Sequence, residues 1–142
     1  SQKYQWGSLI DAMNSKDTSP HIAMVWVSAH YGEAGSILES RYHSKNSASW
    51  EQNEWLENDT IDQMIDEALT EPDKQERFQL YEEIQQEIMD MTPSLFLHTQ
   101  YSEHAYQQYV TWPAAEDEAD AVPVMGYNID ARDIEVTPPG ER

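Results

Sequence analysis

The chain has 142 residues, and its 27 aspartates and glutamates against 8 lysines and arginines give a formal net charge of −19. This charge would repel a phosphate backbone, and the chain has no basic stripe, so nucleic acid is excluded as a partner. Cysteine is absent, which excludes a disulfide framework, a thiol nucleophile and a thiolate metal site.

The first quarter of the chain is predicted to contain a helix, a loop and a strand. A polar cluster at 14–20 predicts the loop. The mostly apolar run 21–27 predicts a buried strand of a mixed or parallel sheet, and the two glycines within 30–35 permit a tight turn after it. The helix comes first, because apolar residues recur there at helical spacing. These residues are Trp6, Leu9, Ile10 and Met13.

Two amphipathic helices are predicted in the middle of the chain, after a helical turn at 36–42 and a loop at 43–53. Each shows apolar residues at a spacing of about 3.6 residues. The first begins near 58, where Asn, Asp and Thr all cap well. Its apolar face holds Ile61, Met64, Ile65 and Ala68. The second lies between two prolines, at 72 and 93. Its buried face holds Arg77, Tyr81, Ile84, Ile88 and Met91.

A capping box is predicted at the start of the second helix, because Asp73 stands three residues before Glu76. The aspartate oxygen would accept a hydrogen bond from a free backbone N–H, while the glutamate would reach back to the backbone of Asp73. After Pro93, the short apolar run 94–98 predicts a second buried strand.

The last third of the chain is less regular. Residues 101–109 are aromatic without a clear period, and the acidic stretch 116–120 predicts a solvated loop. The run 122–127 predicts an edge strand, since its proline is tolerated only at an edge or a strand start. We expect one folded portion over 1–136 and a flexible tail at 137–142.

The acidic charge bears on how the chain folds. Self-repulsion destabilises a compact state at low ionic strength, but at about 1 M salt the Debye length falls to about 3 Å. We therefore expect a halophilic source. Disorder is the alternative explanation of high charge. Five tryptophans, eight tyrosines and the helical periodicity argue against it for most of the chain.

The order and spacing of these residues resemble the C-terminal signature of the family 5 extracellular solute-binding proteins. This family contains the dipeptide, oligopeptide and nickel receptors of ABC importers. The resemblance covers residues 4–130 and includes an upstream strand that ends at Trp26. Its remaining positions are the run Asn58–Ala68, Asp73, Arg77, Leu80, Tyr81, Gln85 or Gln86, Ile88 and Thr92–Ser94.

The resemblance implies an α/β fold: a lobe of the type II periplasmic-binding-protein kind, with a small mixed sheet flanked by helices. Family members are several times longer and have two lobes, so the chain would be the C-terminal portion of such a receptor. It would capture a small solute, with a peptide as the first candidate, and deliver it to a membrane permease at the outer face of the cell membrane. No bond would be broken and no cofactor used.

Ligands of open α/β sheets bind beyond the carboxyl ends of the strands, so the residues after the two predicted strands are the candidate site. Aromatic rings offer broad apolar contact there, and a carboxylate could pair with an ammonium group. The candidate ligand-binding residues are Trp26, His30, Tyr31, Glu33 and Tyr101.

Each candidate also has a simpler explanation. Trp26 could belong to the core, and Glu33 could be one more solvated carboxylate. Peptide-binding members of the family carry an Asp in this loop, just before an Asp-Pro pair, and this Asp holds the amino terminus of the peptide. The stretch 29–35 has neither, although Glu33 could substitute for the Asp. The resemblance therefore carries over membership of the receptor family and does not carry over dipeptide binding.

Two other functions stay open. The chain could be a free-standing acidic module that binds a protein partner, and an exposed sheet edge could pair two copies into a homodimer. It could also be a metal-dependent hydrolase that uses His43, His98 and His104 with Glu103. The spacing of these residues fits neither a helical His pair nor a short-loop zinc pattern.

Overall fold

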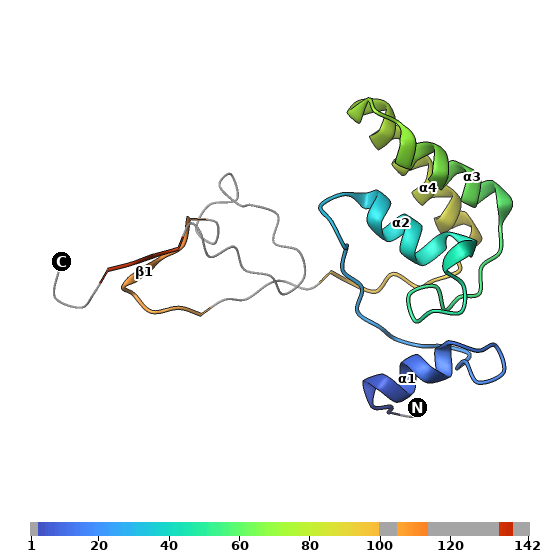
Figure 1. Cartoon of the computed structure of the whole chain (residues 1–142), viewed down its shortest axis with the longest axis horizontal. Coiled ribbons are helices and arrows are strands. Elements are labelled where there is room, and N and C mark those ends of the chain that lie inside the picture. The colour runs from blue at the N-terminus through green and yellow to red at the C-terminus, as the bar shows by residue number, and fades with distance from the viewer. Residues whose placement is uncertain (1–2, 100–104, 114–133, 138–142) are drawn as a thin grey trace. The chain divides into compact units, whose positions relative to one another are not determined.

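The computed structural model describes residues 3–99, 105–113 and 134–137, which form helices and one small sheet (Figure 1). The chain divides into two compact units, Ser1–Leu95 and Phe96–Arg142. The first unit holds helices α1 to α4, and the second holds strands β1 and β2. The protein is therefore of mixed helix and sheet composition, in line with the coarse expectation of α/β.

The predicted helices are confirmed. Helix α1 spans Trp6–Met13. Helix α2 spans Ala34–Tyr42, two residues longer at its start than the predicted turn, and a short 3-10 helix follows at Ser44–Asn46. Helices α3 (Asp59–Thr70) and α4 (Lys74–Met91) are joined by a three-residue connection. Among the described residues, no helix is long and apolar enough to span a bilayer.

Side chains cap both long helices. The Asn58 Oδ1 accepts hydrogen bonds from the backbone N–H groups of Thr60 and Ile61, at 3.0 and 3.2 Å. Asp73 accepts from the N–H groups of the second and third residues after it, at 2.8 and 3.0 Å. The reciprocal half of the predicted capping box is wrong. The N–H of Asp73 donates to the carboxylate of Glu71, at 2.8 Å, instead of to Glu76.

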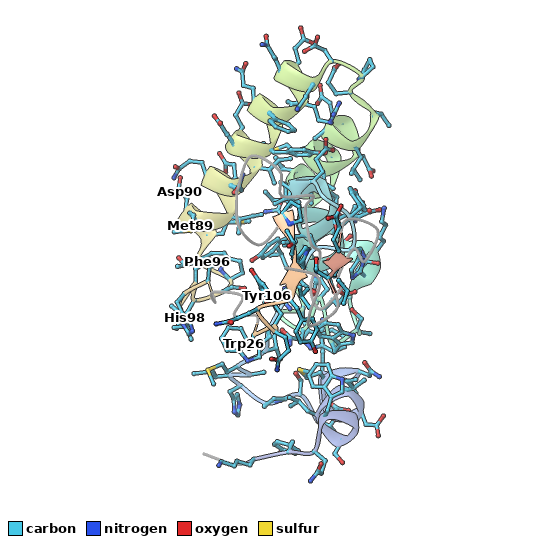
Figure 2. The ribbon with its side chains drawn as sticks, turned by 90° about the vertical axis from the view of Figure 1, so that its left-hand side faces the viewer. Trp26, Met89, Asp90, Phe96, His98 and Tyr106 are labelled. Atoms are coloured by element: carbon cyan, nitrogen blue, oxygen red, sulfur yellow. The ribbon has the colours of Figure 1, made fainter. Side chains whose placement is uncertain are left out.

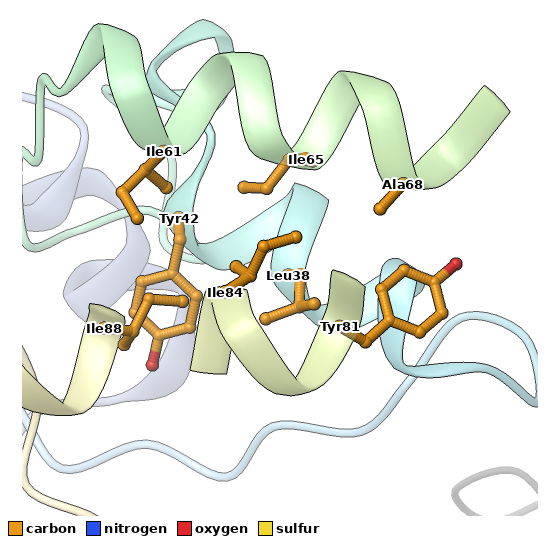
Figure 3. Packing of buried hydrophobic residues seen from close by; sticks show 8 residues of the cluster. All are labelled: Leu38, Tyr42, Ile61, Ile65, Ala68, Tyr81, Ile84 and Ile88. Carbon is orange, nitrogen blue, oxygen red and sulfur yellow. The ribbon is translucent and has the colours of Figure 1, made fainter. Parts of the chain in front are cut away.

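The core lies where α2, α3 and α4 meet (Figure 3). Residues three and four apart on α3 and α4 share a face, so each helix presents one apolar stripe to the others. Met64 and Met91, also expected on these stripes, are partly buried against the cluster. Its buried members are Leu38, Tyr42, Ile61, Ile65, Ala68, Tyr81, Ile84 and Ile88.

The two predicted buried strands are wrong. Residues 21–27 belong to no sheet: the chain bends at His21 and Ile22, and Ile22 is 84% exposed. Residues 94–98 also form no strand, and Leu95, Phe96 and Leu97 are largely exposed. An apolar run becomes a strand only when a neighbouring strand accepts its backbone hydrogen bonds, and neither run has one among the described residues.

The described sheet forms elsewhere. Strand β1 (Val110–Thr111) pairs antiparallel with β2 (Glu135–Val136), with Val110 opposite Val136. One further backbone hydrogen bond, from Thr137 N to the Tyr109 carbonyl at 2.8 Å, extends the pairing. The predicted edge strand at 122–127, the acidic loop at 116–120 and most of the predicted tail lie outside the described residues.

The assignment of core and surface predicts a contrast between two identical substitutions. Ile84→Ala removes buried methyl groups and leaves a cavity, so we expect it to lower the free energy of unfolding by about 2–4 kcal/mol. Ile22→Ala, the matched control at an exposed site, should change it by less than about 0.5 kcal/mol. Chemical denaturation in molar salt measures both. An equal cost at the two positions would contradict the exposed placement of the segment 21–27.

Candidate functional site

The loop that follows the segment 21–27 is fixed to α2 by its own backbone. The hydroxyl oxygen of Ser36 accepts hydrogen bonds from the N–H of His30, at 2.6 Å, and from the N–H of Tyr31, at 3.4 Å. Ser36 lies in the first turn of α2 and is buried. Because a loop backbone held by a buried group loses conformational freedom, the side chains of His30 and Tyr31 are presented from a fixed position.

The carboxylate of Glu33 attaches the same loop to α4. Arg77 binds it with two nitrogens: Nη2 donates to Oε1 at 2.8 Å and Nε donates to Oε2 at 3.1 Å. The Tyr81 hydroxyl donates to Oε2 at 2.9 Å. Arg77 also donates from Nη1 to the Glu71 carbonyl at 2.9 Å. Paired Arg–carboxylate bonds fix both distance and orientation, so they position this loop closely.

This network shifts the titration of its members. The Arg77 guanidinium, followed by the Tyr81 hydroxyl, holds the pKa of Glu33 below its ordinary value by hydrogen bonding to the charged carboxylate. Burial, followed by the hydrogen bond to Glu33, raises the pKa of Tyr81 to about 12. Glu33 is therefore charged and Tyr81 neutral at every pH at which the network forms.

Gly35 makes room for the network. A Cβ atom at this position would stand 2.5 Å from the Tyr81 hydroxyl oxygen and 2.9 Å from a Leu69 methyl carbon. Real Cβ atoms essentially never approach other atoms this closely, so any larger residue would push Tyr81 away from Glu33. Gly35 is one of the two glycines that the sequence predicts to permit a turn, and its role here is close packing.

The structure places the predicted site residues in two positions. His30, Tyr31 and Glu33 share the loop described above, while Trp26 lies on the segment before it and is 55% exposed. Figure 2 shows the Trp26 side chain projecting from the ribbon. Tyr101 lies outside the described residues.

The side chains of His30 and Tyr31 are accessible from solvent. The His30 Nε2 lies 2.8 Å from the Glu51 carboxylate, in an exposed contact. Tyr31 is also largely exposed. Its partial burial, followed by the charges of Glu39 and Glu33, raises its pKa above the ordinary value. The loop can thus offer a neutral phenol and an imidazole to a ligand, whereas both oxygens of Glu33 already have partners inside the protein.

A second, buried network supports the unit from the other end of α2. Arg41 forms an ion pair with Glu54, and the two side chains are only 7% and 10% exposed. The Ser94 hydroxyl donates to the same glutamate at 2.7 Å. One nitrogen of Arg41 and one oxygen of Glu54 have no hydrogen-bond partner among the described residues. Removal of one member of such a buried pair costs about 3–5 kcal/mol, because the other charge is left uncompensated.

A third polar cluster joins α2 to α3. The two ring nitrogens of His43 each lie 3.3 Å from a carboxylate oxygen, of Asp62 and of Asp66. Asp62 also accepts the backbone N–H of Ser44 at 2.8 Å. Among the described residues, no group of three potential ligands is arranged to hold a metal ion. His104 and Glu103, which the hydrolase hypothesis needs, lie outside that part of the chain.

Sequence reasoning did not identify Ser36, Arg77 and Tyr81 as the residues that hold the loop. One signal was available: Arg77 is a charged residue on the otherwise apolar face of a helix, four residues before Tyr81. A charge at such a position needs a buried partner. Nothing local in the sequence indicates that this partner is Glu33, which lies 44 positions earlier.

The lowered pKa of Glu33 predicts a pH dependence of stability. A group with a depressed folded-state pKa contributes stability above its ordinary value, here 4.5, and loses it as the pH falls through the folded-state pKa. The free energy of unfolding should therefore differ between the wild type and Glu33→Gln by a constant amount above pH 4.5. The difference should shrink below that pH.

The matched control is Glu57→Gln, which removes the carboxylate of an exposed ion pair with Lys16. It should cost no more than about 1 kcal/mol. The free energy of unfolding of the wild type and the two variants is measured by denaturation from pH 3 to pH 8. The other carboxylates contribute equally to all three proteins, so their contributions cancel in the differences. Equal behaviour of the two variants would show that Glu33 is an ordinary surface residue.

The raised pKa of Tyr81 gives a spectroscopic prediction. In an ultraviolet titration of tyrosinate, the eight tyrosines should include one component with a midpoint of about 12, and Tyr81→Phe should remove it. The stability that this hydroxyl contributes is present below pH 10 and is lost as the pH rises towards 12. If Tyr81→Phe instead removed a component with a midpoint near the ordinary value of 10, that result would contradict the burial of Tyr81 and its hydrogen bond to Glu33.

Comparisons with known proteins leave the family of this chain open. No protein-family model matches the sequence, no curated protein is significantly similar to it, and no solved structure matches its fold.

Proposed function

We propose that the protein is the substrate-binding component of an ABC importer, which captures a small solute and delivers it to a membrane permease. The proposal rests on the sequence resemblance to family 5 solute-binding proteins. Within it, the chain is part of a lobe of the type II periplasmic-binding-protein kind and forms one wall of an interlobe cleft. Its place would be the outer face of the cell membrane, and its source a halophile.

The observation that best supports binding is the fixed and exposed loop at His30 and Tyr31. Its backbone is tethered to buried Ser36, and the adjoining Glu33 is held by Arg77 and Tyr81. A preorganised loop loses little conformational entropy when a ligand binds. Little of the free energy from contacts with its exposed rings is therefore needed to order the loop, and more of it contributes to the affinity. Exposed aromatic residues on a rigid scaffold are typical of binding sites.

The proposed roles follow from the exposure of each side chain. Trp26 and Tyr31, which are 55% and 45% exposed, supply apolar surface for a solute, and His30 supplies a polar group. Glu33 acts as a positioning residue, since Arg77 and Tyr81 occupy its carboxylate. Without a free carboxylate, this loop does not reproduce the family's capture of a peptide amino group. A short peptide is the first candidate ligand, and sugars and metal chelates are the next.

A test uses the protein encoded by the complete gene, purified in molar KCl and equilibrated with a mixture of two- to five-residue peptides. Mass spectrometry of the retained material identifies the ligand, and calorimetry then measures its affinity. Trp26→Ala should weaken binding about tenfold, equivalent to about 1.4 kcal/mol. Trp6→Ala, which removes an equally exposed tryptophan from α1, should change it less than about twofold.

Two results would contradict the proposal. One is retention of no peptide, sugar or metal chelate by the folded protein. The other is a ligand whose affinity is unchanged in both Trp26→Ala and His30→Ala, which would place its site elsewhere.

A second candidate function, an acidic interaction module, is favoured by a different observation. The unit Ser1–Leu95 exposes large apolar side chains outside its helices, at Ile22 and Met24. Contiguous exposed apolar surface commonly marks a protein interface. The protein-binding function and the solute-binding function use different residues, so the Trp26 and His30 variants in the peptide assay separate them.

A further inference from the structure

Glu51 carries a carboxylate that has lost much of its water and has a single partner. Its side chain is 19% exposed, and its Oε1 lies 2.8 Å from Nε2 of His30. The other oxygen makes no hydrogen bond with any residue in the described ranges. A carboxylate with so little water around it is stabilised by further donors, so this oxygen is an open position for an N–H group of a ligand.

The imidazole of His30 adds a second hydrogen-bond acceptor beside this carboxylate. The backbone N–H of His30 is held by the hydroxyl of Ser36 at 2.6 Å, and the ring is 57% exposed. In the neutral ring, Nε2 carries the proton that faces Glu51, and the lone pair of Nδ1 accepts hydrogen bonds. No residue in the described part of the chain donates to Nδ1. In that form, the pair offers acceptors to a ligand, and its one ring N–H is already used.

Two cations around the same loop are already paired with other carboxylates. Arg77 binds Glu33 at 2.8 Å, and Lys45 binds Glu39 at 2.8 Å. Neither cation is therefore available to neutralise a negative group of a ligand beside the imidazole. Such a group would meet the charge of Glu51, whereas a positive group would gain an ion pair with it.

We propose that Glu51 determines the charge selectivity of the solute site, and that the solute presents an ammonium or guanidinium group to Glu51 and His30. This inference rests on the proposed solute-binding function. Glu51 lies between α2 and α3, outside the loop that carries Glu33. A hydrogen bond from a charged donor to a carboxylate is roughly twice as strong as a neutral one, so loss of the positive charge weakens binding.

This contact differs from the general attraction of cations to an acidic chain. The net charge of −19 attracts any cation at low ionic strength. At about 1 M salt the Debye length is about 3 Å, so charges beyond direct contact are largely screened. A preference for a positive ligand that persists in 1 M KCl therefore reports a direct contact.

Three blocked peptides that differ in one side chain test the selectivity. They are acetyl-Ala-Lys-Ala-amide, acetyl-Ala-Gln-Ala-amide and acetyl-Ala-Glu-Ala-amide, which are positive, neutral and negative. Their affinities are measured by calorimetry in 1 M KCl, with the protein encoded by the complete gene. The lysine peptide should bind at least about tenfold more tightly than the glutamine peptide, and the glutamate peptide should bind more weakly than both.

Glu51→Gln removes the charge and keeps the size of the side chain. In this variant, the affinities for the lysine and glutamine peptides should agree within about twofold. The matched control is Glu57→Gln, which removes an equal charge from an exposed ion pair with Lys16, and it should keep the tenfold ratio. Far-ultraviolet circular dichroism establishes that both variants are folded. The peptide series on the wild type needs no variant and tests the selectivity independently.

Three results would overturn the role of Glu51. They are equal affinity of the wild type for the lysine and glutamine peptides, no binding of the lysine peptide, and a tenfold ratio that survives in Glu51→Gln. Each is compatible with the proposed function, provided that the protein retains some other solute. Failure of the proposed function is recognised separately, by retention of no peptide, sugar or metal chelate at all.

Discussion

The attachment of the Glu33 carboxylate to Arg77 and Tyr81 is the constraint on which the candidate site depends. It joins a surface loop to α4. The turns of α4 that carry Ile84 and Ile88 pack into the core with α2 and α3. Tyr81 belongs to both systems, because its ring is buried in the core while its hydroxyl binds the loop. The packed helices therefore restrict the motion of the loop residues proposed to contact a ligand.

Polar networks connect several of the segments around this core. Ser36 holds the start of the loop, Arg41 and Glu54 hold the residues between α2 and α3, and the hydroxyl of Ser94 holds the chain after α4. Buried hydrogen bonds of this kind specify one arrangement, because a displaced partner would leave an unsatisfied group behind.

Several large apolar residues outside the core are exposed to solvent, although the chain is strongly acidic. The runs near Met24 and Leu97 are exposed outside the helices, where an acidic, salt-adapted surface would be expected to place carboxylates. Exposed apolar strand-like segments carry a risk of aggregation unless another strand or layer covers them.

The sequence by itself determined the local structure of this protein and part of its core. The period of Ile61, Ile65 and Ala68 predicted α3, and the caps at Asn58 and Asp73 located the starts of both long helices, because these signals act over one or two turns. The capping box failed only in its second half, where Glu71 competes with Glu76 for the same N–H.

Only the tertiary structure decided which apolar runs are buried and which polar residues meet. The runs 21–27 and 94–98 have the composition of buried strands, but a strand exists only when a distant segment pairs with it, and composition carries no information about that segment. Likewise, Glu33 is one of 27 acidic residues in the sequence. Its distinct role arises because packing of α2 against α4 brings it to Arg77 and Tyr81, 44 and 48 positions away.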